Sequence, residues 1–242
     1  MSAMHLDAIN LKAFYASPLG QVARRLLGAR LKSRLGDLKG ARVFGLGYAI
    51  PYLGAIRSEA DVLGALMPAG QGAIQWPEGH ANETVLVEET ELPLRDDSAD
   101  CILLVHMLEG SENARELLRE LWRVLSPQGR LLIVVPNRRG LWAQLDTTPF
   151  GYGSPYSRSQ LATLLKDAMF SPENWQYALY LLPFGWRVPL RWPVFFERLG
   201  LVLWPAFSGV IVVEATKQVY GAVPVHARAR IRRQFVPVPA GP

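Results

Sequence analysis

The sequence predicts an α/β fold in which helices cover both faces of a mostly parallel sheet. Apolar runs of strand length alternate with segments of helical periodicity, the order that produces parallel pairing. A glycine turn joins one of these strands directly to a helix. The chain has 242 residues, of which 50% are hydrophobic, so one large core is available. We therefore expect a single three-layer αβα sandwich over residues 1–220, followed by a basic flexible tail over residues 221–242.

The N-terminal part predicts a helix, then a strand that leads into a second helix. Residues 17–36 place apolar side chains at spacings of three and four, with basic side chains around them. The apolar run 42–47 has the pattern of a strand, and Gly45 and Gly47 close it. Pro51 stands where it suits the first turn of the next helix.

The remaining elements continue the alternation. The clearest helix starts after Ser111 and runs to about Leu125, where Ser126-Pro-Gln-Gly129 ends it. Ser157 and Gln160 have the spacing of a capping box, which predicts another helix. Further strands are expected at residues 61–66, 84–88, 100–105, 130–135, 176–182 and 210–215.

Residues 183–208 interrupt this pattern with prolines and aromatic side chains. The prolines preclude one long helix, and Arg187, Arg191 and Glu197 break the apolar stretches, so no transmembrane helix of about 20 residues is available. Such a segment serves as a hydrophobic lid, a protein-partner surface or a patch in peripheral contact with a membrane. Plain burial in the core or in an interface is the interpretation we favour.

The basic excess belongs to the two ends of the chain. Against 21 acidic residues there are 26 Lys and Arg, a net charge of +5; residues 1–42 carry +6 and residues 221–242 carry +4, which leaves −5 elsewhere. This favours surface or partner contacts over a cationic active-site groove. The single cysteine, Cys101, has no internal disulfide partner, and the first residues lack an export-signal pattern, so a cytoplasmic location is expected.

The glycine turn is the first candidate binding feature. Gly45, Leu46 and Gly47 stand at the carboxyl end of a predicted parallel strand, where open α/β sheets bind ligands. Glycines there allow close approach of a ligand to backbone N–H groups and to the positive end of the next helix. An ordinary strand-to-helix turn explains the same residues equally well.

Three segments between residues 85 and 136 share the pattern of a known family. They are Val87-Glu-Glu-Thr-Glu-Leu-Pro93-Leu, Asp97-Ser-Ala-Asp-Cys-Ile-Leu-Leu-Val-His106-Met-Leu-Glu109 and Leu117-Leu-Arg-Glu-Leu-Trp-Arg-Val-Leu-Ser-Pro-Gln-Gly129-Arg-Leu-Leu-Ile. The last segment, a helix followed by Pro-x-Gly and a strand, is the most specific. Through these segments, residues 85–136 resemble the second half of a class I S-adenosylmethionine-dependent methyltransferase. With the two glycines the similarity spans about residues 40–136, and the chain looks like an atypical bacterial member of the type 11 group.

The resemblance implies a Rossmann-like fold with a seven-stranded sheet and S-adenosylmethionine as the cofactor. It places the glycine turn under the cofactor, an acidic pair against the adenine, and the end of the fourth strand beside the methionine portion. A carboxylate suits the donors of the adenine amino group, but the acidic pair also fits a solvated strand end. The residues assigned to the cofactor in this way are Gly45, Leu46, Gly47, Tyr48, Glu88, Glu89, Val105 and His106.

Two positions depart from the family pattern. The family usually has an acidic residue two positions before the first glycine, where this chain has Val43. It also has an acidic residue at the end of the second strand that holds the ribose, where this chain reads Leu63-Gly-Ala-Leu-Met-Pro-Ala-Gly70. Losing charge-assisted hydrogen bonds of about 1.5–3 kcal/mol each predicts weaker cofactor binding, or a ribose held by other groups.

His106 is the candidate catalytic base because it ends the fourth strand; a histidine that only hydrogen-bonds backbone is equally consistent. Methyl transfer depends mainly on alignment and desolvation, so no strict motif is expected. Arg138 and Arg139 either receive an anionic acceptor or solvate a turn. Tyrosines that line the pocket or simply pack are Tyr15, Tyr152 and Tyr156.

Two functions remain open. The first is methyl transfer to a small-molecule or lipid-like acceptor. The second is a methyltransferase-fold binding protein with a degraded cofactor site, acting through its aromatic surface; similarity to bacterial proteins encoded beside glyoxalase II-like hydrolases makes such a hydrolase a candidate partner. Nucleic-acid methylation is disfavoured, because His106-Met-Leu-Glu109 stands where an Asn/Asp-Pro-Pro-Tyr/Phe motif would be expected.

Overall fold

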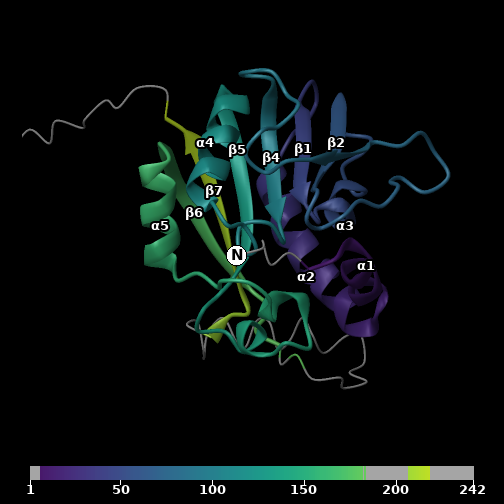
Figure 1. The fold of residues 1–242 in the computed structure, drawn as a ribbon, viewed down its shortest axis with the longest axis vertical. Coiled ribbons are helices and arrows are strands. Elements are labelled where there is room, and N and C mark those ends of the chain that lie inside the picture. The colour runs from purple at the N-terminus through teal and green to yellow at the C-terminus, as the bar shows by residue number, and fades with distance from the viewer. Residues whose placement is uncertain (1–5, 182, 184–206, 219–242) are drawn as a thin grey trace, which may run out of the picture.

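Seven strands form one sheet in the order β3-β2-β1-β4-β5-β7-β6, with helices on both faces (Figure 1). The structure is a computed structural model, and it describes residues 6–181, 183 and 207–218. The predicted three-layer α/β architecture is confirmed for these residues. The aromatic segment expected at 183–208 lies mostly outside the described residues, and the tail expected at 221–242 lies entirely outside them.

Five strands make up the parallel part of the sheet. Each pairs in parallel with its neighbours in the order β3-β2-β1-β4-β5. The chain leaves β1 in one direction to form β2 and β3 and returns on the other side as β4, so the strand order reverses between β1 and β4. The bounds are β1 Arg42–Gly47, β2 Val62–Pro68, β3 Thr84–Val87, β4 Ala99–Val105 and β5 Leu125–Pro136.

The last two strands make the sheet mixed. β7 (Val210–Lys217) pairs antiparallel with both β5 and β6 (Phe170–Ala178). The prediction that β6 starts near residue 176 was wrong, because its first half carries polar side chains on a half-covered edge strand and shows no apolar run. Residues 126–129, expected to lie before β5, fall inside it, between the pairs Ala99–Leu125 and Cys101–Arg130 where the register shifts.

Helices build one core on each face of the sheet. α2 (Pro18–Leu35) and α3 (Ile50–Leu53) cover one face, and α4 (Ala114–Val124) and α5 (Arg158–Asp167) cover the other. The capping box predicted for α5 is present. α1 (Ala8–Ala16) and the short 3₁₀ turns η1 (Leu141–Gln144) and η2 (Pro149–Gly151) lie beyond the carboxyl ends of the parallel strands (Figure 1). No described helix is long and apolar enough to cross a bilayer.

α1 was not expected from the sequence. It is nine residues long and lacks a clear polar face, so its periodicity is weak. A sharp corner at Ser17 separates it from α2, and the Ser17 side chain caps α2 by accepting from the N–H of Gly20. A Cβ at Gly20 would lie 1.9 Å from the carbonyl oxygen of Phe14, so this corner requires glycine there.

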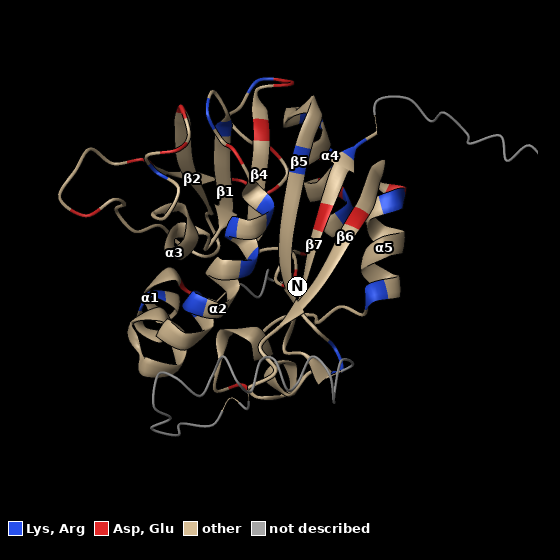
Figure 2. Cartoon of the chain, turned by 180° about the vertical axis from the view of Figure 1, so that it is seen from behind, with Lys and Arg blue, Asp and Glu red and all other residues tan. Residues whose placement is uncertain are grey.

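α2 contains five of the eight Lys and Arg residues found in residues 1–42 and no acidic residue (Figure 2). Its apolar face packs on the sheet through buried leucines such as Leu27 and Leu31. Its carboxyl end is held by Arg130 of β5, whose guanidinium donates to the carbonyls of Arg34 at 2.9 Å and Leu35 at 2.8 Å. This cation satisfies terminal carbonyls that the helix itself leaves unpaired.

Asp100 connects the amino ends of β1, β4 and β5 and gives a test of the fold. It accepts from the guanidinium and backbone N–H of Arg42 and from Ser126, and Arg42 lowers the pKa of Asp100 from 3.8 to about 2. The folded pKa is depressed, so this stabilisation is present above about pH 4 and is lost as the pH falls towards 2.

We expect Asp100→Asn to lower the melting temperature at neutral pH and to flatten its decline between about pH 4 and 2. Thermal denaturation followed by circular dichroism over that range measures this. The control is Asp146→Asn, which removes an exposed carboxylate with no side-chain contact to other described residues. If Asp100→Asn leaves the pH profile of the melting temperature unchanged, the ion pair of Asp100 with Arg42 does not contribute to stability.

Candidate functional site

The strand-to-helix turn after β1 is so tight that it needs both glycines. Gly47 has a φ of +80°, and a Cβ there would lie 2.3 Å from the carbonyl oxygen of Val105. A Cβ at Gly45 would lie 2.6 Å from the Cβ of Ala49 at the start of α3. The glycines therefore let α3 pack onto β1 and bring the turn against the end of β4.

The turn and the end of β4 form one unit. Gly47 pairs with Val105 in the sheet, and the N–H of Tyr48 donates to the carbonyl oxygen of Val105 at 2.8 Å. Leu46 and Val105 are fully buried, and Tyr48 is 2% exposed. We call this unit, together with the side chains of Tyr15, Gln71, His106 and Glu109 around it, the switch-point site.

His106 stands at the centre of a chain of buried polar groups. Its φ is +51°, which turns the backbone sharply away from β4. Its Nε2 lies 2.9 Å from the hydroxyl of Tyr15, and that hydroxyl lies 3.1 Å from the hydroxyl of Tyr52. On the other side of the ring, Nδ1 lies 3.4 Å from Oε1 of Glu109.

The proton positions follow from these neighbours. A carboxylate facing Nδ1 favours the tautomer with its proton on Nδ1, which leaves Nε2 as an acceptor. Tyr15 then donates to Nε2 and accepts from Tyr52. Burial raises the pKa of Tyr15 and Tyr52 far above neutrality, so both phenols keep their protons at physiological pH.

Aromatic rings enclose this polar chain. Tyr15 stacks on Tyr48 with ring centroids 5.7 Å apart, and the ring of Phe150 in η2 lies 4.7 Å from that of His106. Burial also raises the pKa of Tyr48 to about 12, although the nearby Arg24 opposes this shift. The histidine is consequently shielded from water by residues of α1, α3 and η2.

Two buried side chains beside His106 have oxygens without a hydrogen-bond donor in the described part of the chain. Gln71 is 2% exposed; its Nε2 donates to the carbonyl oxygen of His106 at 3.0 Å, but its Oε1 has no partner there. Neither carboxylate oxygen of Glu109, 7% exposed, accepts a hydrogen bond from a described residue. Unsatisfied buried acceptors are costly, so these oxygens are the strongest indication of a ligand.

α1 covers the switch-point site. The N–H of Ala8 donates to the carbonyl oxygen of Gln71 at 2.8 Å, and Tyr15 closes the other end of the helix over His106. Ala49 is 1% exposed and His106 5% exposed, so the turn and the end of β4 are shut off from solvent in this conformation. α1 therefore lies between the solvent and Gln71 and His106.

Glu88 and Glu89, the acidic pair that follows β3, lie in two different environments. Glu89 is half-buried and accepts from the hydroxyl of Ser111 at 2.7 Å, which ties it to the start of the α4 region. Glu88 is exposed and forms a backbone bridge with Glu91. No described contact joins either side chain to the glycine turn, so their place against an adenine stays a prediction.

The candidates on the acceptor side do not form one group. Arg138 donates to the carbonyl oxygen of Pro155, and Arg139 is exposed. Tyr156 donates to the carbonyl oxygen of Leu108 at 3.3 Å, and burial raises its pKa to about 12. Tyr152 is 38% exposed. Of these, only Tyr156 lies against the segment that follows β4.

Gln71 and the roles of Tyr52 and Glu109 were not predicted from the sequence. Gln71 lies three residues beyond Pro68, the last residue of β2, where the missing ribose-binding acid was sought. The connection after β2 is rich in glycine, which predicts only a loose loop. The fold alone shows that the side chain of Gln71 reaches the end of β4. Among the described residues no cluster of His, Cys, Asp or Glu has the geometry of a metal site.

The strand order and a covered glycine turn at the switch point define an α/β fold of the class that binds nucleotide-like cofactors. Residues 44–133 match a family model described as a methyltransferase domain. This match lies within the region, residues 40–136, over which the sequence resembles such methyltransferases. No curated protein matches the chain.

Solved structures share the fold at low sequence identity. A SAM-dependent methyltransferase from Archaeoglobus fulgidus has a TM-score of 0.60 and 19% identity, over 86% of this chain and 98% of that one. A methyltransferase in complex with the Haloferax volcanii Trm112 methyltransferase activator has a TM-score of 0.61 and 14% identity, over 86% and 97%. The Burkholderia thailandensis 1,6-didemethyltoxoflavin-N1-methyltransferase, with its substrate and S-adenosylhomocysteine bound, has a TM-score of 0.50 and 18% identity, over 79% and 76%.

The hydroxyl of Tyr15 gives a direct test of the cover. We expect Tyr15→Phe to lower the free energy of unfolding by roughly 1–2 kcal/mol, because His106 and Tyr52 each lose a buried hydrogen-bond partner. Urea denaturation measures the change, and proteolysis of the N-terminal segment reports whether α1 is released more often.

Tyr152→Phe is the matched control, because it removes a hydroxyl from a partly exposed tyrosine outside the site. If the two variants are equally stable, the Tyr15 hydroxyl does not hold α1 in place.

Proposed function

We propose that this protein binds S-adenosylmethionine at the switch-point site and transfers the methyl group to a small-molecule or lipid-like acceptor. The observation that carries the proposal is the pair of buried, unsatisfied side chains, Gln71 and Glu109, beside the glycine turn of a methyltransferase domain. When bound, this cofactor supplies an electrophilic methyl group. The related structure from Burkholderia thailandensis, which contains S-adenosylhomocysteine, supports a cofactor of this type.

The residues present fit the cofactor in their chemistry. Oε1 of Gln71 is a free acceptor at the end of β2, where the family holds the ribose hydroxyls with a carboxylate. Glu109 places a negative charge beside His106, where the resemblance puts the cationic methionine portion. Glu88 is an exposed acceptor at the end of β3, suited to the adenine amino group. The glycine turn supplies close backbone approach.

An amide in place of a carboxylate makes the ribose contact weaker. A neutral acceptor forms a hydrogen bond of about 0.5–1.5 kcal/mol, against about 1.5–3 kcal/mol for a charged one. The cost of moving α1 adds to this deficit, since the bond from Ala8 to Gln71 and the contacts of Tyr15 must be broken first. We therefore expect weak affinity and slow association.

His106 is the proposed base, with Glu109 and Tyr15 as its positioning residues. Glu109 faces Nδ1 and stabilises the imidazolium that forms when Nε2 takes a proton from the acceptor. In the covered conformation Nε2 is occupied by the hydroxyl of Tyr15. Movement of α1 therefore exposes the site and frees the base in the same step.

The cofactor contact is tested by calorimetric titration with S-adenosylhomocysteine. We expect Gln71→Ala to weaken binding roughly tenfold and Gln71→Glu, which restores an acid, to strengthen it. Gln144→Ala, at an exposed glutamine of η1, is the control and should match the wild type. Equal affinities for all four proteins would remove Gln71 from the site.

Absence of binding by the wild type at millimolar concentration would overturn the proposal. The two missing acids and the covered site would then favour the second function, a methyltransferase-fold protein that acts on a partner through its aromatic segment. Co-purification of a protein that is lost on changing Trp186 and Trp192 to alanine would support that function; both residues lie outside the described part of the chain.

A further inference from the structure

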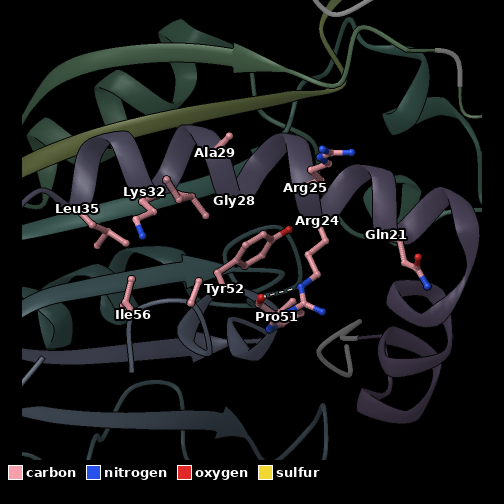
Figure 3. Close-up of a pocket in the computed structure, with 12 residues that line it drawn as sticks. Gln21, Arg24, Arg25, Gly28, Ala29, Lys32, Leu35, Pro51, Tyr52 and Ile56 are labelled. Carbon is pink, nitrogen blue, oxygen red and sulfur yellow. Dashed lines mark hydrogen bonds between the residues drawn. The ribbon is translucent and has the colours of Figure 1, made fainter. Parts of the chain in front are cut away.

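A groove of about 430 Å³ is lined by residues of α2, of α3 and of the turn after α3 (Figure 3). We call it the α2–α3 groove. The side chains of α2 form one wall, and Tyr52 and the turn after α3 form the other. Its volume lies within the range of small-molecule and cofactor sites. The site proposed above leaves the groove unused, because only Tyr52 belongs to both.

The groove is open because position 28 is a glycine. A Cβ at Gly28 would have one neighbour within 4 Å, Cδ1 of Tyr52 at 3.9 Å. Ala29 and Ala55 are the small residues that line the groove on either side. The floor is apolar, formed by Leu31, Leu35 and Ile56 with the ring of Tyr52. A glycine inside a helix lowers the stability of the helix. The packing of α2 does not require a glycine at position 28, so packing does not explain the open space.

Cations stand on both sides of this gap. Arg24, Gly28 and Lys32 are spaced by four residues along α2, so they lie on one face of the helix. Figure 3 shows Arg24 reaching Pro51 of α3, while Lys32 points to the side of Ile56, in the turn after α3. Arg24 uses Nε to donate to the carbonyl oxygen of Pro51 at 3.0 Å, and its terminal nitrogens have no partner among the described residues. Lys32 forms one exposed ion pair with Glu59, and none of the described residues lining the groove is acidic.

We propose that the α2–α3 groove binds an anionic phospholipid, with the phosphate between Arg24 and Lys32 and the adjoining glycerol and acyl carbons over Gly28 and Tyr52. The two cations select a phosphate. A free phosphate would leave most of the volume and the apolar floor unfilled, so the ligand carries an apolar part. This inference stands apart from methyl transfer and does not depend on it.

Other occupants fit the groove less well. Residues 184–206 and 219–242 both carry a basic excess, so charge disfavours these segments of the same chain. The outer face of α2 is basic as well, since α2 contains five Lys and Arg and no acid, which disfavours a second copy placed against it. The same face is suited to the negative surface of a bilayer, to which each nearby cation contributes about 1 kcal/mol.

The experiment measures binding of the full chain to vesicles of phosphatidylcholine alone or mixed with phosphatidylglycerol, and to soluble dihexanoyl-phosphatidylglycerol. We expect binding to the mixed vesicles and to the soluble lipid, and none to phosphatidylcholine alone. Inorganic phosphate at the same concentration should not displace the soluble lipid. Arg24→Gln with Lys32→Gln should weaken vesicle binding roughly thirtyfold. Arg95→Gln with Arg119→Gln, which removes two exposed charges elsewhere, should leave binding to the soluble lipid unchanged.

Gly28→Leu separates the groove from general surface charge. It keeps every cation, fills the gap and favours the helix, so the protein should melt no lower than the wild type while binding to the soluble lipid falls roughly tenfold. Gly28→Ala adds only one methyl group and should bind as the wild type does.

Unchanged binding of Gly28→Leu, equal losses for the two charge pairs, or no binding by the wild type would each overturn the proposal. Displacement of the lipid by a short RNA with the same dependence on Gly28 would assign the groove to nucleic acid and would also overturn it.

Discussion

The contact between Gly47 and the carbonyl oxygen of Val105 is the constraint on which the rest of the structure depends. It occurs where the strand order reverses, so it holds together the two halves of the parallel sheet at the edge where ligands bind. A left-handed glycine allows β1 to turn within one residue and start α3. The same turn brings Tyr48 and Tyr52 towards the end of β4, and His106, itself at positive φ, then turns its side chain into their midst. Backbone geometry, rather than any single side chain, assembles the site.

The enclosure of His106 shows how a polar site can be stable while it is closed. Each buried hydroxyl and ring nitrogen in the chain from Tyr52 to Glu109 has a neighbour at polar contact distance, and the aromatic rings around it contribute apolar burial. The exceptions are Oε1 of Gln71 and the poorly aligned Glu109 carboxylate. The packing of α1 offsets the free-energy cost of burying these acceptors without donors. The covered state is therefore a balance between buried apolar area and unsatisfied acceptors. A ligand that satisfies those acceptors shifts the balance towards the open state, provided that it interacts better with that state.

Sequence patterns predicted those helices and strands whose buried side chains follow a regular pattern along the chain. Strands such as β4 are covered on both faces and read as continuous apolar runs, and α4 and α5 carry a clear stripe or a capping box. The start of β6 was missed because an edge strand with one half-exposed face has no such run. α1 was missed because it is short and also carries apolar side chains on its exposed side, such as Ile9, so its buried face does not stand out in the sequence. Of the candidate site, the glycine turn and His106 were predictable from local spacing. Gln71 was not, because its significance arises only when β2 and β4 are placed on either side of β1.

Tyr52 connects the two binding features without making them one site. Its hydroxyl donates into the chain that ends at His106, and its ring borders the α2–α3 groove opposite Gly28. A substitution at Tyr52 would therefore disturb both, and its effect on either could not be assigned. Gly28 and Gln71 separate them, because Gly28 lines the groove, whereas Gln71 contacts α1 and the end of β4 and does not line the groove. A change at Gly28 that altered binding at Gln71 would consequently have to act through Tyr52 or through the corner that joins α1 to α2. Both routes run through the contacts of Tyr15, so the energy that holds α1 in place is the quantity that links the groove to the switch-point site.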